Sequence, residues 1–355
     1  MEKKEDNIHL SRLLQTWYAQ SKRELPWRDT SNPYLIWISE VILQQTRVNQ
    51  GHDYFLRFVQ QFPNVVSLAH AKEDEVLKMW QGLGYYSRAR NLHAAAKQIV
   101  NDFHGVFPER HDDILSLKGV GAYTAAAVAS IAYNAPYAVI DGNVYRVLSR
   151  LFCIDEPIDT GAGRKIFARI ASDILDKENP GNHNQALMEL GAMVCKPAQP
   201  QCDICPLQAM CMAYENKTIS RFPQKRGRTK IKERFFHYFY VEQDGFAFIK
   251  KRVGNDIWKN LYEFPLVETD VPQDLPQLTE NSDFRTLFRS LTEINITHKL
   301  FLKHVLTHRI VYINFYILTL DYNDTFDTEN RFTKISVDQI GNYAVSRPIH
   351  KFLEG

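Results

Sequence analysis

The sequence predicts two domains, an all-α domain followed by a smaller α+β domain. Its 355 residues exceed what one hydrophobic core usually organises. From about residue 8 to residue 215, segments with apolar residues spaced three or four apart follow one another, separated by short turns rich in Gly, Pro and Asp. Beyond residue 234, runs of β-branched and aromatic residues are typical of strands. We therefore expect domains at residues 8–216 and 235–352, joined by a connector at residues 217–234.

The helical segments of the first domain share apolar residues at i, i+3 and i+4 positions. They lie at residues 10–20, 75–84, 89–103, 122–133, 142–152 and 184–195. In the second domain, residues 235–252 and 309–322 predict strands, and residues 284–294 predict a helix. The connector holds eight Lys or Arg residues and one Glu, so we expect it to be exposed.

Composition favours an ordinary globular protein, with 45% hydrophobic residues, 24% charged residues and a net charge of +2. No apolar run near the N-terminus is long enough for a signal peptide, and none approaches the length that spans a membrane. We expect a soluble cytoplasmic monomer with no membrane partner, associated with the nucleoid if the source is a bacterium.

Four of the five cysteines fall within seventeen residues. They are Cys195, Cys202, Cys205 and Cys211, spaced C-x6-C-x2-C-x5-C. In a reducing compartment such a cluster favours metal binding over disulfides, and four thiolates suit either tetrahedral zinc or an iron–sulfur cluster. Thiol chemistry alone leaves both open. Cys153 has no partner nearby in sequence and is expected to be a small buried hydrophobe.

A Gly-Val-Gly sequence, Gly119-Val120-Gly121, separates two helical segments. Two glycines allow positive φ angles and the close approach of another backbone. The free N–H groups at the start of the following helix favour an anion, and Lys118 adds a positive charge. The pattern fits either a tight turn between helices or a site for phosphate.

Two carboxylates stand in apolar surroundings. Glu40 interrupts residues 34–43, of which eight of ten are apolar, in a helix that should begin at Asn32-Pro33. Asp141 ends an apolar run where a helix begins, so it could simply be an N-cap. Burial would raise the pKa of Glu40, whereas hydrogen bonds at a helix N-terminus would keep Asp141 ionised. An acid and an anion of this kind suit cleavage of an N-glycosidic bond.

The cysteine spacing closely resembles the [4Fe–4S] loop of the endonuclease III/MutY family, and the Gly-Val-Gly turn resembles the helix-hairpin-helix of DNA repair proteins. The segments "SEVILQQTRV", "QGLGYYSRARNLHAAA", "LKGVGAYTAAAVASIAY", "VIDGNVYRVLSRL" and "ALMELGAMVC" follow, in order, the pattern of MutY-type adenine DNA glycosylases. The resemblance implies an all-α helix-hairpin-helix glycosylase domain with a [4Fe–4S] loop at residues 195–211, followed by a smaller α+β Nudix-like domain. It also implies, as partner, double-stranded DNA containing A:8-oxoguanine or A:G mispairs, whose adenine is flipped out of the duplex and removed.

The resemblance also implies roles for individual residues. Glu40 matches the general acid, Asp141 the carboxylate at the sugar, and Tyr123 and Asn143 positions that support the transition state. Endonuclease III-type enzymes carry a nucleophilic Lys where this chain has Tyr123, so we expect a monofunctional enzyme. The residues expected to contact DNA are Gln45, Thr46, Leu83, Tyr85, Lys118, Gly119, Val120, Gly121, Thr307 and His308.

Several of these matches have ordinary structural alternatives. Leu83 and Tyr85, taken alone, also fit core positions. The family has Leu-Pro-Gly where this chain has Leu-Lys-Gly, and its Phe-Ser-His segment for reading 8-oxoguanine matches residues 306–308, Leu-Thr-His. The segment "DIWKNLYEFPLVE" resembles the Nudix-like domain, but the Glu pattern of a catalytic Nudix box is missing, which favours recognition over hydrolysis. The alternatives are an endonuclease III-like glycosylase/lyase for pyrimidine lesions and a non-catalytic iron–sulfur DNA-binding protein.

Overall fold

The computed structural model describes residues 2–227, 231–291, 295–320, 326 and 331–355. It forms two compact units. One comprises Met1–His70 and Asn91–Gly227, and the other comprises Ala71–Arg90 and Arg228–Gly355. Ala71–Arg90 thus group with the C-terminal unit although they lie inside the range expected for the first domain. Of the predicted connector, residues 228–230 lie outside the described residues.

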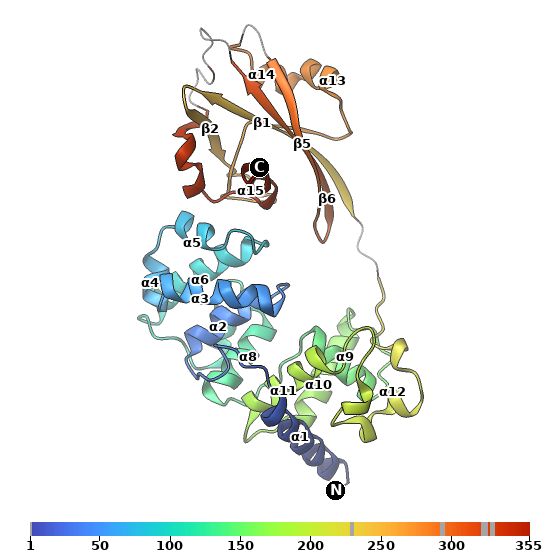
Figure 1. The fold of residues 1–355 in the computed structure, drawn as a ribbon. Coiled ribbons are helices and arrows are strands. Elements are labelled where there is room, and N and C mark those ends of the chain that lie inside the picture. Colours follow the sequence, from blue (N-terminus) through green and yellow to red (C-terminus); the bar gives the residue numbers. More distant parts are fainter. Residues whose placement is uncertain (1, 228–230, 292–294, 321–325, 327–330) are drawn as a thin grey trace. The chain divides into compact units, whose positions relative to one another are not determined.

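Helices build the chain up to residue 215 (Figure 1). Those of the first unit are α1 (Glu2–Ser21), α2 (Pro33–Leu43), α3 (Val48–Gln61), α4 (Val65–His70), α6 (Ser87–Asp102, mostly in this unit), α7 (His111–Ser116), α8 (Ala122–Tyr133), α9 (Gly142–Leu151), α10 (Gly161–Ile174), α11 (Pro180–Met193) and α12 (Met212–Glu215). Helix α5 (Glu73–Met79) belongs to the second unit. Among the helices that the structure describes, none is long and apolar enough to cross a membrane.

Helix packing in the first unit places four helices around one site. Helices α1, α9, α10 and α11 share a core that includes the fully buried Leu148 and Phe167. Helix α2 contacts α8 and α3, and α11 contacts α9, α1 and α8. Helices α2, α8, α9 and α11 therefore meet on one side of the unit, where burial of apolar surface fixes their positions.

Local capping explains where two of these helices begin. The Asn32 side chain accepts hydrogen bonds from the N–H groups of Tyr34 and Leu35, and Pro33 occupies the first turn. The Asp141 side chain accepts from the N–H of Val144 at the start of α9. Both N-caps were predicted from the sequence, and both are confirmed.

The second unit is built on a mixed sheet, seven-stranded among the described residues. Its strands are β1 (Lys232–Gln243), β2 (Phe246–Lys251), β3 (Tyr262–Glu263), β4 (Leu266–Thr269), β5 (Asn295–Val305), β6 (Arg309–Thr319) and β7 (Thr333–Ser336). The order is β3-β2-β1-β6-β5, with β4 on β1 and β7 on β2, and β1 and β6 are parallel. Helices α13 (Leu275–Glu280) and α14 (Ser282–Leu287) pack over one face, and α15 (Arg347–Leu353) ends the chain.

The predicted fold class, an all-α domain followed by an α+β domain, is confirmed, but three local predictions differ. The helix expected at residues 284–294 ends at Leu287, and residues 292–294 lie outside the described residues. Strand β5 was not predicted, because it lies at the sheet edge and only a few of its side chains are even half-buried. Strand β1 begins at Lys232, inside the range expected for the connector.

Candidate active site

Glu40 lies where α2 lines a pocket of about 510 Å³. The residue is 8% exposed and, with Ser39, interrupts the apolar side chains of α2. Burial raises the pKa of Glu40 to about 7, and the neighbouring charge of Asp141 adds to this rise. A hydrogen bond from Tyr123 acts in the opposite direction. The side chain can therefore hold a proton near neutral pH, as the sequence predicted.

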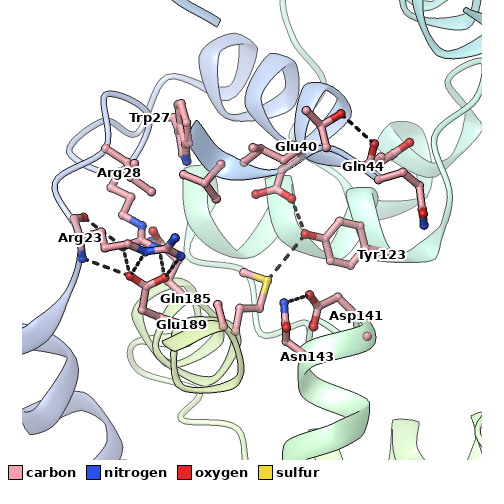
Figure 2. Close-up of a pocket in the computed structure, with 18 of the residues that line it drawn as sticks. Arg23, Trp27, Arg28, Glu40, Gln44, Tyr123, Asp141, Asn143, Gln185 and Glu189 are labelled. Carbon is pink, nitrogen blue, oxygen red and sulfur yellow. Dashed lines mark hydrogen bonds and ion pairs between the residues drawn. The ribbon is translucent and has the colours of Figure 1, made fainter. Parts of the chain in front are cut away.

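Tyr123 reaches the same pocket from the first turn of α8. Its phenol donates a hydrogen bond to Glu40 Oε2 at 2.5 Å and approaches Met188 Sδ at 3.6 Å (Figure 2). Burial raises the pKa of Tyr123 well above its ordinary value, so the phenol keeps its proton. Because Oε2 accepts this bond, a proton on the Glu40 carboxyl is directed to the other oxygen.

Asp141 enters the pocket from the N-terminus of α9. Its Oδ1 accepts from the Val144 N–H and its Oδ2 from Asn143 Nδ2, both at 2.7 Å. Burial raises the pKa of Asp141, while these hydrogen bonds and the charge of Arg146 oppose the rise. The hydrogen bonds were expected to keep Asp141 ionised, but burial outweighs them and the net effect is a raised pKa.

Asn143 is held in turn by Arg146. Arg146 Nη2 donates to Asn143 Oδ1 at 2.8 Å and to the Gly191 carbonyl at 2.7 Å, while Nε donates to the Cys195 carbonyl at 2.7 Å. A chain of hydrogen bonds thus runs from the backbone of the first clustered cysteine to Asp141. It fixes the rotamer of Asn143 and therefore the orientation of the carboxylate.

An ion-pair triad around the buried Glu189 forms another wall of the pocket, and the sequence analysis missed it. Glu189 on α11 accepts from both Arg23 and Arg28, with Nη2–Oε2 distances of 2.5 Å (Figure 2). Burial would raise the pKa of Glu189, but the two arginines lower it to about 2. Gln185 and Trp27 also line the pocket. A carboxylate within the apolar sequence "ALMELGAMV" was the available signal for Glu189, the same signal that identified Glu40.

Gln45 and Thr46 line this pocket just beyond the end of α2. Gln45 has a φ of 58°, the left-handed region that side chains other than Gly seldom adopt. Gln44 Nε2 donates to Thr124 Oγ1 at 3.3 Å and joins the turn to α8. Gln45 and Thr46, both predicted to contact DNA, therefore share one cavity with Glu40.

The Gly-Val-Gly turn joins α7 to α8 as predicted, but only one of its glycines needs to be glycine. Gly119 has a φ of 76°, and a Cβ there would lie 2.5 Å from the Asn91 Cβ. Gly121 has a φ of −102° and no neighbour within 4 Å of such a Cβ, which corrects the expectation for both glycines. Lys118 is exposed, and its N–H donates to Gln98 Oε1. The exposed Lys118 and the open space at Gly121 leave the start of α8 accessible to an anion.

The remaining predicted contacts lie in the second unit. Tyr85 is 48% exposed with a φ of 48°, and its phenol lies 2.6 Å from Thr307 Oγ1. Thr307 and His308 form the turn between β5 and β6, and with Tyr85 they line a cavity of about 350 Å³. Leu83 is buried, with 7% exposure. The structure therefore brings Tyr85, Thr307 and His308 together and places Leu83 in the core.

The four clustered cysteines line one small cavity together with Arg150. Two short 3-10 turns, Cys202–Ile204 and Gln208–Met210, arrange the loop. Burial raises the pKa of the Cys205 thiol to about 11 and also raises the pKa of Cys202 and Cys211, and the charges of neighbouring thiolates add to the rise. Binding of a metal centre would offset the free-energy cost of forming buried thiolates.

The cysteines fit an iron–sulfur cluster. In the described part of the chain, no three His, Cys, Asp or Glu side chains come close enough to hold one metal ion. A [4Fe–4S] cluster takes a Cys thiolate at each iron, so its ligands surround the cluster instead of meeting at a single ion. Four cysteines around one cavity match that requirement.

Comparisons with known proteins find matches for both parts of the chain. Residues 38–171 match the family described as "HhH-GPD superfamily base excision DNA repair protein", and residues 237–355 match the NUDIX domain. The chain is similar to an adenine DNA glycosylase of Buchnera aphidicola subsp. Acyrthosiphon pisum, 32% identical over 97% of this chain and 96% of the relative. It is 31% identical to an adenine DNA glycosylase of Mus musculus over 95% of this chain and 76% of the relative.

Among solved structures, the fold is similar to a thermostable thymine-DNA glycosylase, with a TM-score of 0.55 and 27% identity. The match covers 61% of this chain and 98% of that structure. The shared part thus has the size of a glycosylase domain without the second unit.

Proposed function

Because the chain belongs to the adenine DNA glycosylase family, we propose that it removes adenine mispaired with 8-oxoguanine or G from double-stranded DNA. The enzyme is a DNA glycosylase of base-excision repair. The observation that carries the proposed chemistry is the buried carboxyl of Glu40, held by Tyr123 in a pocket that also contains Asp141.

Glu40 serves as the general acid in this proposal. A flipped adenine in the pocket accepts the proton of the Glu40 carboxyl at a ring nitrogen as the N-glycosidic bond breaks. Tyr123 fixes the carboxyl through Oε2 and leaves the other oxygen for the proton. A pKa near neutrality is well suited to an acid that must be protonated yet able to give up its proton.

Asp141 serves the sugar. As the base leaves, positive charge develops on the sugar ring, and the Asp141 carboxylate stabilises it or captures it before water completes hydrolysis. Asn143 and the Val144 N–H keep the carboxylate directed at one place. Such preorganisation lowers the barrier because the anion need not reorient during the reaction.

The enzyme is monofunctional in this proposal. A glycosylase/lyase forms a Schiff base through an amine, whereas this chain places the phenol of Tyr123 beside Glu40. The phenol cannot form a Schiff base. The product is therefore an abasic site in an intact strand.

DNA is held in several places in this proposal. Lys118 and the start of α8 contact phosphates, and Gln45 and Thr46 contact the mispair beside the pocket. Tyr85, Thr307 and His308 contact the base opposite adenine. Cys195, Cys202, Cys205 and Cys211 hold a [4Fe–4S] cluster, which ties the loop at residues 195–211 to the domain.

One assay tests the activity. Base release is measured on matched duplexes that contain A:8-oxoguanine, A:G, A:T or an oxidised pyrimidine. We expect release of adenine from the A:8-oxoguanine and A:G duplexes. The DNA strand should stay intact unless alkali is added. The Glu40→Gln variant should bind the duplex and release no adenine. Release of the pyrimidine lesion, or a covalent adduct trapped by borohydride, would contradict the proposal.

A further inference from the structure

Arg150 connects α9 to the cysteine loop. It lies one turn beyond Arg146 and is 3% exposed. Its Nη1 donates to Cys195 Sγ at 3.3 Å and to the Lys196 carbonyl at 2.7 Å, and its Nη2 donates to the Pro197 carbonyl at 3.0 Å. One side chain thus touches a cluster cysteine and the backbone that follows it.

The charge of Arg150 has no carboxylate to balance it. Its guanidinium donates to Cys195 Sγ and two backbone carbonyls, and in the described part of the chain no Asp or Glu forms an ion pair with it. A buried charge without a counter-charge is costly. A [4Fe–4S] cluster with four thiolates is net negative in its common oxidation states, so it would supply the missing counter-charge.

The thiol of Cys211 gives a second contact between Arg150 and the loop. Its Sγ lies 3.6 Å from the Arg150 carbonyl oxygen. The side chain and the backbone of one residue therefore approach cysteines at both ends of the loop, Cys195 and Cys211. No other arginine has a hydrogen bond to a clustered sulfur among the described residues.

We propose that Arg150 is the positioning residue of the cluster: its guanidinium donates a hydrogen bond to the Cys195 thiolate, balances the cluster charge and holds the backbone of residues 196–197. The inference rests on the proposed [4Fe–4S] cluster. It predicts two separable effects. The positive charge and the hydrogen bond stabilise the more reduced, more negative cluster and raise its reduction potential. The three-point attachment slows loss of the cluster.

The variants Arg150→Gln and Arg150→Lys separate charge from attachment, and Arg169→Gln, an exposed Arg on α10, is the control. Each full-length protein is assayed for iron and acid-labile sulfide. Its reduction potential is then measured by voltammetry, and the decay of its visible absorbance in the presence of a chelator gives the rate of cluster loss. A role limited to packing would change the loss rate and leave the potential unchanged.

We expect Arg150→Gln to shift the reduction potential to more negative values and to lose its cluster several-fold faster than the control. Arg150→Lys should shift the potential less than Arg150→Gln, because the charge remains. It should still lose its cluster faster, because one ammonium group cannot reach Sγ and both carbonyls. If Arg150→Gln gives no folded protein, the loss rate of Arg150→Lys decides.

A control-like potential or a control-like loss rate in Arg150→Gln would overturn the inference, as would a control-like loss rate in Arg150→Lys. Either result, obtained with iron and sulfide present in the wild-type protein, leaves the proposed cofactor intact. Wild-type protein that lacks iron and sulfide would overturn the cofactor itself and this inference with it. The two failures are therefore distinguishable.

Discussion

Glu40 shows how a single buried carboxyl can govern the pH dependence of the enzyme. Burial brings its pKa to about 7, so the acid loses its proton as the pH rises through that value. The single-turnover rate of adenine release should be highest just below about pH 7 and fall tenfold per pH unit well above it. It should fall again at lower pH as Asp141, whose pKa is also raised, takes up a proton. A rate that stays level up to about pH 9 would contradict the role of Glu40 as the acid.

The Glu40 carboxyl should also make the folded protein less stable as the pH rises. Its pKa is higher in the folded protein than the ordinary 4.5, so the folded state binds the proton more tightly. Stability from this group is complete below about pH 4.5 and is lost as the pH rises to about 7. The rise in the pKa of Glu40 corresponds to roughly 3 kcal/mol in the free energy of unfolding.

Glu40→Gln should therefore raise the free energy of unfolding by roughly 1–3 kcal/mol at about pH 8 and by much less at about pH 5, since the neutral amide still accepts from Tyr123. Urea titrations at the two pH values measure the difference. An equal effect at both pH values would show that the side-chain change acts through packing instead of charge.

The sequence could identify some site residues and not others for a physical reason. Glu40 and Asp141 interrupt apolar runs, and local pattern reveals such an interruption. The partners of Glu189 are Arg23, 166 positions away, and Arg28, 161 positions away, so only the fold brings them together. The net pKa rise of Asp141 likewise depends on burial by distant helices.

Helix α9 carries Asp141 at one end and both buried arginines further along, so its interior supports the site. Arg146→Ala would leave the Asn143 amide oxygen and the carbonyls of Gly191 and Cys195 without their donor. We expect a loss of about 2–4 kcal/mol in the free energy of unfolding. Adenine release should slow by at least about tenfold as the orientation of Asp141 is lost. Urea denaturation and single-turnover assays check both effects, with the exposed Arg169→Ala as control. Wild-type values in Arg146→Ala would contradict this support.

The hairpin between α7 and α8 allows a matched pair of variants. Gly119→Ala forces a side chain into a φ of 76° and against Asn91, so it should lower the free energy of unfolding by about 1–3 kcal/mol. Gly121→Ala has an ordinary φ and open space, and it should change stability by no more than about 0.5 kcal/mol. Thermal unfolding measures both. Equal losses would mean that the two glycines serve the fold alike.

Elements were predicted from the sequence where burial follows a helical or strand period. The start of α2 and the whole of α8 were predicted because caps and apolar spacing are local. Strand β5 was missed because it is an edge strand whose side chains are mostly exposed, so burial imposes no alternating apolar pattern on it, although it pairs with β6 in a local hairpin. The inclusion of Ala71–Arg90 in the second unit was not predicted either. It depends on contacts between distant parts of the chain, such as that of Tyr85 with Thr307.

At the scale of the whole molecule, the proposed chemistry and the proposed recognition of the opposite base belong to different units. Tyr85→Phe and Thr307→Val each remove the same 2.6 Å hydrogen bond, so each should reduce the preference for A:8-oxoguanine over A:G by about two- to tenfold. The double variant should lose no more than either single one, because the effects of groups that act through one bond are not additive. Single-turnover rates on both duplexes, measured from about pH 6 to about pH 9, test this. The pH at which the rate falls through loss of the Glu40 proton should stay unchanged, because Glu40 lies in the other unit. Additive losses in the double variant would mean that Tyr85 and Thr307 act separately.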